Sequence, residues 1–361
     1  MGRCLRAVLS QWEADPERFW LLALERRHLN SLKDWERRGW KLCLYNEAPE
    51  LDVCWFPWNR IDWDPECPRV ALIHDVAAFT EFHPQTRHRE DDRARVAEAV
   101  RHADAVMTVS NFSRGEIHHH LGYPVEDMEV VYWAHDRQVF RSDLPIDPEL
   151  IPEELRGKPF LLYVGTLEPR KNLGGLLEAF ALLEKQLPHQ LALVCPRPHT
   201  SWTDRLWGKT HELEDVTRSL KDRLVWLEQV DDPQLVALYR QADLFVMPSH
   251  YEGFGLPLLE ALACGARCAA SRRSSLPEVG GSLPFYFNPK DSVDMAKVIL
   301  EALQSPARSA EELEQHLQHF SWAQTAGEIL HYIEEVARRP RRTGSGVFPS
   351  LPPHLQLPEG I

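Results

Sequence analysis

The feature that most restricts the fold of this chain is a regular alternation of short apolar, β-branched runs with stretches of helical periodicity. Such runs suit buried strands, and the helical stretches suit crossover helices that return the chain to the same edge of a sheet. The alternation predicts an α/β protein in which each half is a doubly wound parallel sheet. The expected strands are residues 41–45, 70–74, 105–110 and 129–132 in the first half, and residues 160–165, 191–195, 224–227, 244–248 and 267–270 in the second.

A proline-rich stretch separates the two halves. At 361 residues the chain is too long for one typical core and suits two domains of about 150 residues each. Residues 141–159 hold four prolines and Gly157, and such a stretch continues neither a helix nor a central strand. The predicted parts are an N-terminal Rossmann-like, acceptor-side domain (1–140), a linker (141–159), a C-terminal Rossmann-like, nucleotide-sugar-binding domain (160–305), C-terminal helices (306–339) and a disordered tail (340–361).

Composition and charge exclude several classes of function. The formal net charge of -13 repels a phosphate backbone, so nucleic acid is a poor partner for the whole protein. The sequence has neither an apolar run long enough to span a membrane nor a secretory signal, and a cytoplasmic location is expected. Seven cysteines without a C-x-x-C pair predict reduced thiols rather than a disulfide framework or a zinc ribbon.

Two segments are basic against this acidic average. Residues 26–41 place six Lys and Arg side chains beside Trp35 and Trp40, and residues 338–342 hold four arginines. Basic residues interleaved with Trp can hold a protein at an anionic surface, so peripheral contact with the inner face of the membrane is one interpretation. A solvated face of an amphipathic helix is the other, and it is the commoner origin of this pattern.

The segment 160–172 predicts a strand, a tight loop and a helix start. Gly165 and Thr166 follow an apolar run, and Arg170 and Lys171 precede a stretch of leucines at helical spacing. The free amides and the dipole of a helix N-terminus favour an anion, and two cations beside them suit a diphosphate. An ordinary surface pair of cations would need no preceding Gly-Thr turn, so we expect a phosphate site here.

A second strand, glycine loop and helix follow at 244–265. Glu252 lies in the loop and Glu260 one turn inside the helix, whose end is marked by Gly265. Loop glycines let a ligand approach the backbone, and a carboxylate can accept two hydrogen bonds from a vicinal diol such as a ribose. The two carboxylates also fit a general acid and base of a hydrolase, which is the alternative role for them.

These segments resemble the donor-site motifs of a known family. Residues 165–172 and 252–261 are similar to the motifs of retaining glycosyltransferases of family 4, which have the two-domain GT-B fold, and the second contains that family's two glutamates separated by seven residues. Residues 271–281 resemble the tail of the same motif. The similarity extends over residues 70–289 and is dense over 160–281.

The resemblance implies a role for each motif residue. Arg170 and Lys171 would neutralise the donor diphosphate, Glu260 would hold the ribose hydroxyls, and Glu252 would orient the transferred sugar. Preorganised cations and amides would then stabilise the charge of the departing nucleotide, and no metal is expected. The remaining donor-binding positions are Gly165, Thr166, Phe254, Gly255 and Leu256.

The first half contributes His74, Asp75 and Ser110. His74 and Asp75 end the expected strand 70–74, and Ser110 stands at the next strand-to-helix turn. A lone histidine of this kind is more often structural. The resemblance favours a functional role, because in related enzymes a histidine at this position contacts the donor sugar or phosphate.

One family feature has no counterpart in the sequence. Members usually begin with a strand and a glycine-rich loop, whereas residues 1–36 read as largely helical. Either the start is truncated or this domain lacks its first strand, and both interpretations stay open. A noncatalytic nucleotide-sugar-binding assembly subunit, and a GT-B phosphorylase or epimerase, are therefore the alternative functions.

The function that the resemblance favours is a metal-independent, retaining hexosyl transfer. The donor would be a nucleotide sugar such as GDP-mannose, with mannose or rhamnose as the transferred group. The acceptor would be a glycan or a lipid-linked glycan in surface polysaccharide assembly. Transfer would be front-face, with a donor phosphate oxygen taking the acceptor proton, because no side chain is an evident nucleophile.

Overall fold

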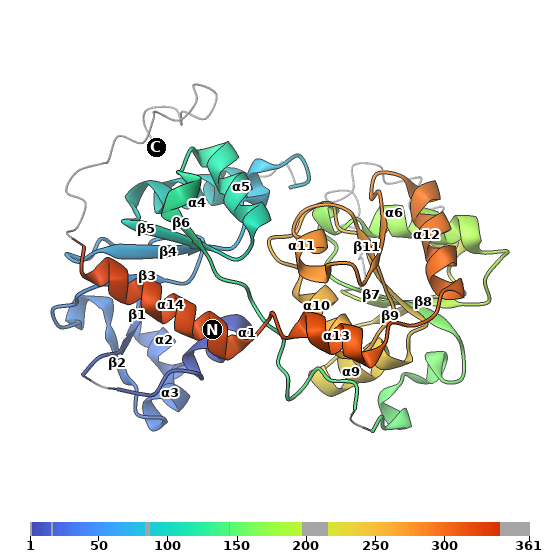
Figure 1. Cartoon of the computed structure of the whole chain (residues 1–361), viewed down its shortest axis with the longest axis horizontal. Coiled ribbons are helices and arrows are strands. Elements are labelled where there is room, and N and C mark those ends of the chain that lie inside the picture. The colour runs from blue at the N-terminus through green and yellow to red at the C-terminus, as the bar shows by residue number, and fades with distance from the viewer. Residues whose placement is uncertain (1, 16, 84–86, 144, 197–215, 340–361) are drawn as a thin grey trace.

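The chain folds into two α/β lobes that lie side by side (Figure 1). The structure is a computed structural model, and it describes residues 2–339 apart from residues 16, 84–86, 144 and 197–215. The elements of the first lobe are α1 (Arg3–Leu9), β1 (Trp20–Ala23), α2 (Arg26–Asn30), α3 (Lys33–Arg37), β2 (Lys41–Leu44), β3 (Cys54–Phe56), β4 (Arg69–Ile73), α4 (Arg87–His102), β5 (Ala105–Thr108), α5 (Asn111–Leu121) and β6 (Met128–Val130). Strands β3 to β6 form a parallel sheet in the order β3-β4-β5-β6, and β1 and β2 form a separate parallel pair.

The second lobe is built on a six-stranded parallel sheet. Its elements are β7 (Phe160–Val164), a 3-10 helix (Pro169–Lys171), α6 (Leu173–Leu183), β8 (Gln190–Val194), β9 (Leu224–Leu227), α9 (Asp232–Gln241), β10 (Leu244–Met247), α10 (Leu256–Ala263), β11 (Cys268–Ser271), α11 (Leu276–Gly280), β12 (Phe285–Phe287), α12 (Ser292–Gln304) and α13 (Ala310–Leu317). The strand order is β12-β11-β10-β7-β8-β9, so the order reverses between β7 and β10. In open α/β sheets a ligand binds at such a switch point, outside the carboxyl ends of the strands.

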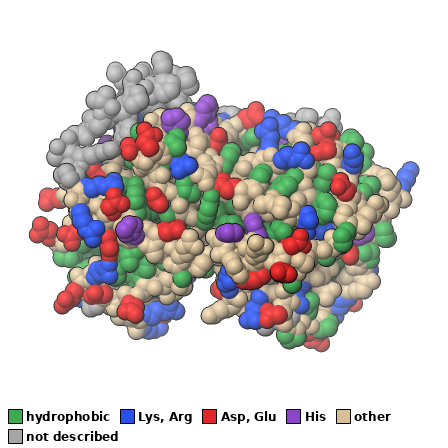
Figure 2. All heavy atoms as spheres, viewed as in Figure 1, with side chains coloured by type: hydrophobic (Ala, Val, Ile, Leu, Met, Phe, Trp, Pro, Cys, Tyr) green, Lys and Arg blue, Asp and Glu red, His purple; other side chains and the backbone are tan. Residues whose placement is uncertain are grey.

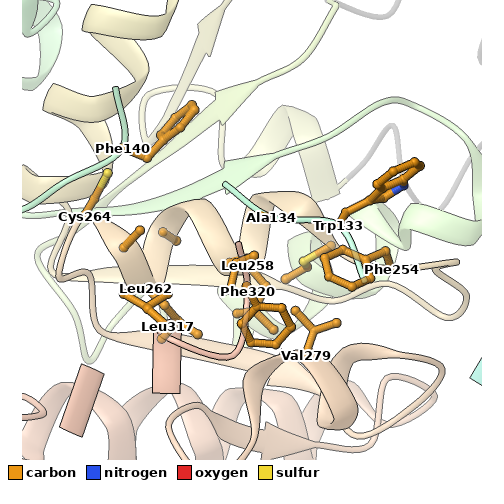
Figure 3. Packing of buried hydrophobic residues seen from close by; sticks show 14 of the residues in the cluster. Trp133, Ala134, Phe140, Phe254, Leu258, Leu262, Cys264, Val279, Leu317 and Phe320 are labelled. Atoms are coloured by element: carbon orange, nitrogen blue, oxygen red, sulfur yellow. The ribbon is translucent and has the colours of Figure 1, made fainter. Parts of the chain in front are cut away.

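The last helix, α14 (Trp322–Ala337), leaves the second lobe and returns to the first (Figure 1). The Trp12 indole donates to the Ala326 carbonyl at 3.0 Å, and the Tyr332 hydroxyl donates to the Asp127 carbonyl at 3.3 Å. The apolar face of α14 joins a core that continues into the second lobe, where Phe254 and Phe320 pack together (Figure 3). Both α13 and α14 lie within the predicted helical segment 306–339, and the chain changes lobes between them.

The beginning of the chain differs most from the sequence prediction. The expectation of a largely helical segment over 1–36 is wrong, because Trp20–Ala23 pairs in parallel with Lys41–Leu44. The apolar residues that suggested a helix instead form a small cluster in which Trp35 and Trp40 are each only 4% exposed. These two indoles are core side chains, so they are not available to enter a membrane. Residues 340–342 of the second basic segment lie outside the described residues.

Candidate active site

The first site loop follows β7, one of the two central strands. The Tyr163 hydroxyl donates to the Thr166 carbonyl at 2.9 Å. A Cβ on Gly165 would lie 2.6 Å from that hydroxyl, so a larger residue there would displace the Tyr163 ring. Arg170 and Lys171 occupy a 3-10 turn just ahead of α6, as predicted. Asn172 then takes a left-handed conformation and caps α6 by accepting from the Gly175 amide at 3.3 Å.

The second site loop follows β10 and leads into α10. Gly255 has φ of 103°, which favours glycine, and α10 begins at Leu256. The Ser275 hydroxyl lies 3.0 Å from the Glu252 carbonyl and 2.7 Å from the Phe254 carbonyl, and it fixes the loop from behind. Both site loops therefore lie at the switch point, because β7 and β10 are neighbours.

A buried carboxylate joins the two loops. Lys171 Nζ donates to both oxygens of Glu252 at 2.7 and 2.9 Å, Arg170 Nη1 lies 3.3 Å from Oε2, and the Ser249 hydroxyl donates to Oε1 at 2.7 Å. Burial alone would raise the pKa of Glu252, but Lys171, Arg170 and these hydrogen bonds outweigh it and hold the pKa below its ordinary value. Glu252 is therefore ionised at neutral pH and unsuited to be a general acid.

Glu260 has a different partner. It lies one turn inside α10, is 3% exposed, and forms an ion pair with Arg3 of α1 at 2.5 Å. Burial raises the pKa of Glu260 to about 7, although Arg3 lowers it in part. This contact was not predicted, because Arg3 lies outside every motif.

The first lobe contacts the second site loop through residues after β4 and β5. The Ser110 hydroxyl donates to the Gly253 carbonyl at 2.6 Å, and the Ser113 hydroxyl lies 3.1 Å from the same oxygen. A Cβ on Gly253 would collide with the His74 carbonyl and lie 2.9 Å from the Asp75 Cβ. His74, Asp75 and Ser110 thus meet the loop that carries Glu252, which is the juxtaposition that the sequence predicted.

The His74 ring is fixed in one tautomer. Its Nε2 lies 3.0 Å from the Pro57 carbonyl, and because a carbonyl only accepts, Nε2 carries the proton. Burial lowers the pKa of His74, so the ring is neutral at pH 7 and its Nδ1 is an acceptor. The Asn59 side chain, which sequence reasoning missed, accepts from the His74 amide at 2.7 Å and holds this loop.

Glu278 lies in the segment 271–281 that resembles the tail of the second motif, but the sequence assigned it no role. Its carboxylate accepts from the Asn111 amide at 2.7 Å, the Asn111 side chain at 2.9 Å, the Phe112 amide at 3.1 Å and the Tyr132 hydroxyl at 2.7 Å. All four donors belong to the first lobe, whereas Glu278 belongs to α11. This carboxylate therefore joins the N-terminus of α5 to the second lobe.

A hollow of about 470 Å³ lies beside these residues. His74 and Asp75 border it from the first lobe and Glu168 and Arg170 from the second, and Trp58 forms part of its wall. The space-filling view shows a notch between the lobes at its lower edge, with acidic and basic side chains interspersed over this face (Figure 2). The hollow places an open space directly against predicted site residues.

The described part of the chain shows no group of His, Cys, Asp or Glu arranged to hold a metal ion. Asp62 and Asp64 form an Asp-x-Asp sequence, but they pair with Arg60 and Arg69 at 2.8 Å each. None of the helices between residues 2 and 339 that the structure describes has the length and apolar character to cross a bilayer.

Comparison with known proteins identifies the family. The model of "Glycosyl transferases group 1" matches residues 149–319. Over 262 residues the chain is 36% identical to O-antigen chain mannosyltransferase B of Escherichia coli, covering 70% of this chain and 66% of that protein. The chain belongs to the group 1 glycosyltransferases. It is also 33% identical over 290 residues to the serotype-specific mannosyltransferase WbdA of Escherichia coli, and this match covers 75% of the chain and 33% of the length of that relative.

Solved structures confirm the fold class of this group 1 member. Anabaena Alr3699/HepE in complex with UDP and glucose has a TM-score of 0.66 at 16% identity, covering 92% of this chain and 95% of that one. Sucrose-phosphate synthase from Thermosynechococcus elongatus has a TM-score of 0.62 at 22% identity, covering 75% of this chain and 68% of that one. The predicted α/β architecture with parallel sheets of the GT-B type is therefore correct.

Proposed function

We propose that this protein transfers a hexosyl group, with mannose favoured, from a nucleoside-diphosphate donor to a glycan or lipid-linked acceptor in polysaccharide assembly. The observation that carries the proposal is the convergence of Arg170 and Lys171 on buried Glu252 at the sheet switch point, beside an open hollow. The names of the two mannosyltransferase relatives support the choice of sugar.

The two cations have donors to spare for a diphosphate. A guanidinium offers five N–H donors and an ammonium three, and the contacts of Arg170 and Lys171 with Glu252 and Glu168 use only part of them. A bound diphosphate would accept from the rest and gain charge-assisted hydrogen bonds. As the sugar leaves, negative charge grows on the same phosphate oxygens, so the cations stabilise the transition state more than the ground state.

The reaction we propose is front-face substitution with retention. The bond between the donor anomeric carbon and the phosphate oxygen breaks, the acceptor oxygen bonds to that carbon from the same side, and the acceptor proton passes to the departing phosphate. Ionised Glu252 would accept hydrogen bonds from the sugar hydroxyls, and Nδ1 of neutral His74 would accept a hydrogen bond from a hydroxyl. Arg170 and Lys171 would compensate the negative charge of the departing diphosphate, and we assign no metal to that role.

The test is turnover. The protein would be incubated with GDP-mannose, dTDP-rhamnose and UDP-glucose, each with and without mannosyl oligosaccharide acceptors. Release of nucleotide and the anomeric configuration of the product would be measured by chromatography and NMR. We expect GDP-mannose to be consumed faster with acceptor and the configuration to be retained. Binding of nucleotide sugars without turnover on any acceptor would instead favour the assembly-subunit function.

A further inference from the structure

The contact of Arg3 with Glu260 links the first lobe to a predicted nucleotide-binding carboxylate. Arg3 Nη2 lies 2.5 Å from Glu260 Oε1, and Nη1 lies 3.1 Å from Asp232 Oδ1. The guanidinium also lies over the Phe140 ring, 5.4 Å from its centroid. Asp232 and Phe140, which are distant in sequence, therefore help to hold the Arg3 guanidinium against Glu260.

The burial of these groups is unequal. The Glu260 side chain is 4% exposed, whereas the side chains of Arg3 and Asp232 are 51% and 47% exposed. A carboxylate this buried is unfavourable as an anion unless a cation is close to it. Arg3 supplies that cation, because among the charges that act on Glu260 it opposes the effect of burial while Asp232 adds to it.

The other titratable groups near Glu260 do not replace Arg3. Burial raises the pKa of the Tyr239 hydroxyl in α9, and it also raises the pKa values of the Cys4 and Cys264 thiols. All three are therefore neutral at pH 7 and cannot compensate a buried carboxylate. The charge state of Glu260 depends on Arg3 from α1, on Asp232 from α9 and on its own burial in α10.

We propose that Arg3 is a positioning residue for nucleotide binding, which holds the Glu260 carboxylate in the orientation that accepts from the ribose hydroxyls of the donor. This inference rests on the proposed function and assigns to it a residue outside the family motifs. Arg3 occupies one acceptor site, at Oε1 of Glu260. A carboxylate has about four acceptor sites, so the others can accept hydrogen bonds from a ribose diol. The first lobe thereby takes part in binding the nucleotide as well as in transfer.

The experiment compares nucleotide affinity across a small set of variants. Calorimetry with GDP and with UDP would be carried out on the parent, Arg3→Ala, Arg3→Lys, Glu260→Gln and the Arg3→Ala/Glu260→Gln double variant. Arg6→Ala is the matched control, because it removes the same charge from an exposed position of the same helix. Circular dichroism would establish that each variant is folded.

At pH 7.5 we expect Arg3→Ala to weaken binding of the preferred nucleotide by about tenfold, the size of one charge-assisted hydrogen bond. Arg3→Lys should restore most of the affinity, and Arg6→Ala should bind like the parent. Because Arg3 acts through Glu260, the Arg3→Ala/Glu260→Gln double variant should bind the nucleotide with the same affinity as Glu260→Gln alone.

The pH dependence gives a second readout. Arg3 lowers the pKa of Glu260, so in Arg3→Ala the rise of affinity with pH should move to a higher pH than in the parent. Ionisation of the nucleotide itself is the same for every variant. Unchanged or tighter binding by Arg3→Ala would overturn the inference while leaving the proposed function intact. A parent that binds neither nucleotide would overturn the proposed function, and this inference with it.

Discussion

Replacement of Glu278 tests whether the lobes are joined as the structure has them. Glu278→Gln keeps one accepting oxygen and replaces the other with an NH₂ group, which cannot accept. The variant therefore loses either the contact of Oε2 with the Phe112 amide or the contacts of Oε1 with Asn111 and Tyr132. It also removes a negative charge from the N-terminus of α5, where the helix dipole favours one. A fully buried charge-assisted hydrogen bond contributes about 1.5–3 kcal/mol. Asn111 is exposed and Glu278 half-buried, so we expect a smaller total loss of about 1–2 kcal/mol.

A loss of that size should lower the equilibrium ratio of joined to separated lobes by about five- to thirtyfold. Small-angle X-ray scattering with and without nucleotide should show a larger radius of gyration for Glu278→Gln, and its transfer rate should fall by a similar factor. Glu311→Gln, which changes an exposed carboxylate of α13, should behave as the parent. If Glu278→Gln matches the parent in both scattering and transfer, these four hydrogen bonds do not hold the lobes together.

Three further predictions concern the predicted site residues. Replacing both Arg170 and Lys171 with Ala should abolish turnover and weaken nucleoside-diphosphate binding by about 1.5–3 kcal/mol for each lost contact, and unchanged affinity by calorimetry would place the diphosphate elsewhere. Glu260→Gln should weaken binding of the free nucleotide, while Glu252→Gln should spare it and lower transfer; equal effects on nucleotide binding would reject this division. His74→Ala should leave nucleotide affinity nearly intact and lower the transfer rate by about 10²-fold or more, as loss of a positioned group does, and an unaltered rate would remove His74 from the site.

Much of the second lobe was predictable because its signals are local. The apolar runs of β7 and β10, the glycines that follow them and the helix starts at Leu173 and Leu256 are all written in consecutive residues. Local order of this kind fixes where each loop lies on the sheet, and the sheet then brings Lys171 to Glu252. Strands β1, β3 and β12 were missed, because each has only three or four residues and contains no β-branched residue.

Two of the contacts between the lobes, those of Arg3 and Glu278, were not predictable from the sequence. Arg3 and Glu260 are 257 positions apart, and Glu278 meets Asn111 across 167 positions. Neither pair leaves a periodic or motif signal, because their meeting depends on how two finished lobes face each other. The sequence could therefore predict the two site loops and the approach of His74, Asp75 and Ser110 to them, but not the contacts that Arg3 and Glu278 make between the lobes.

The return of α14 to the first lobe has a consequence for how the protein is made. The first lobe consists of residues from both ends of the chain, and its contacts with Ala326, Thr325 and Tyr332 form only when α14 is available. A ribosome releases the chain from its amino end, and domains generally fold in that order. Here the second lobe can emerge and fold entirely while the first still exposes the apolar surface that α14 covers. The lobe that is translated first is therefore the last to be completed.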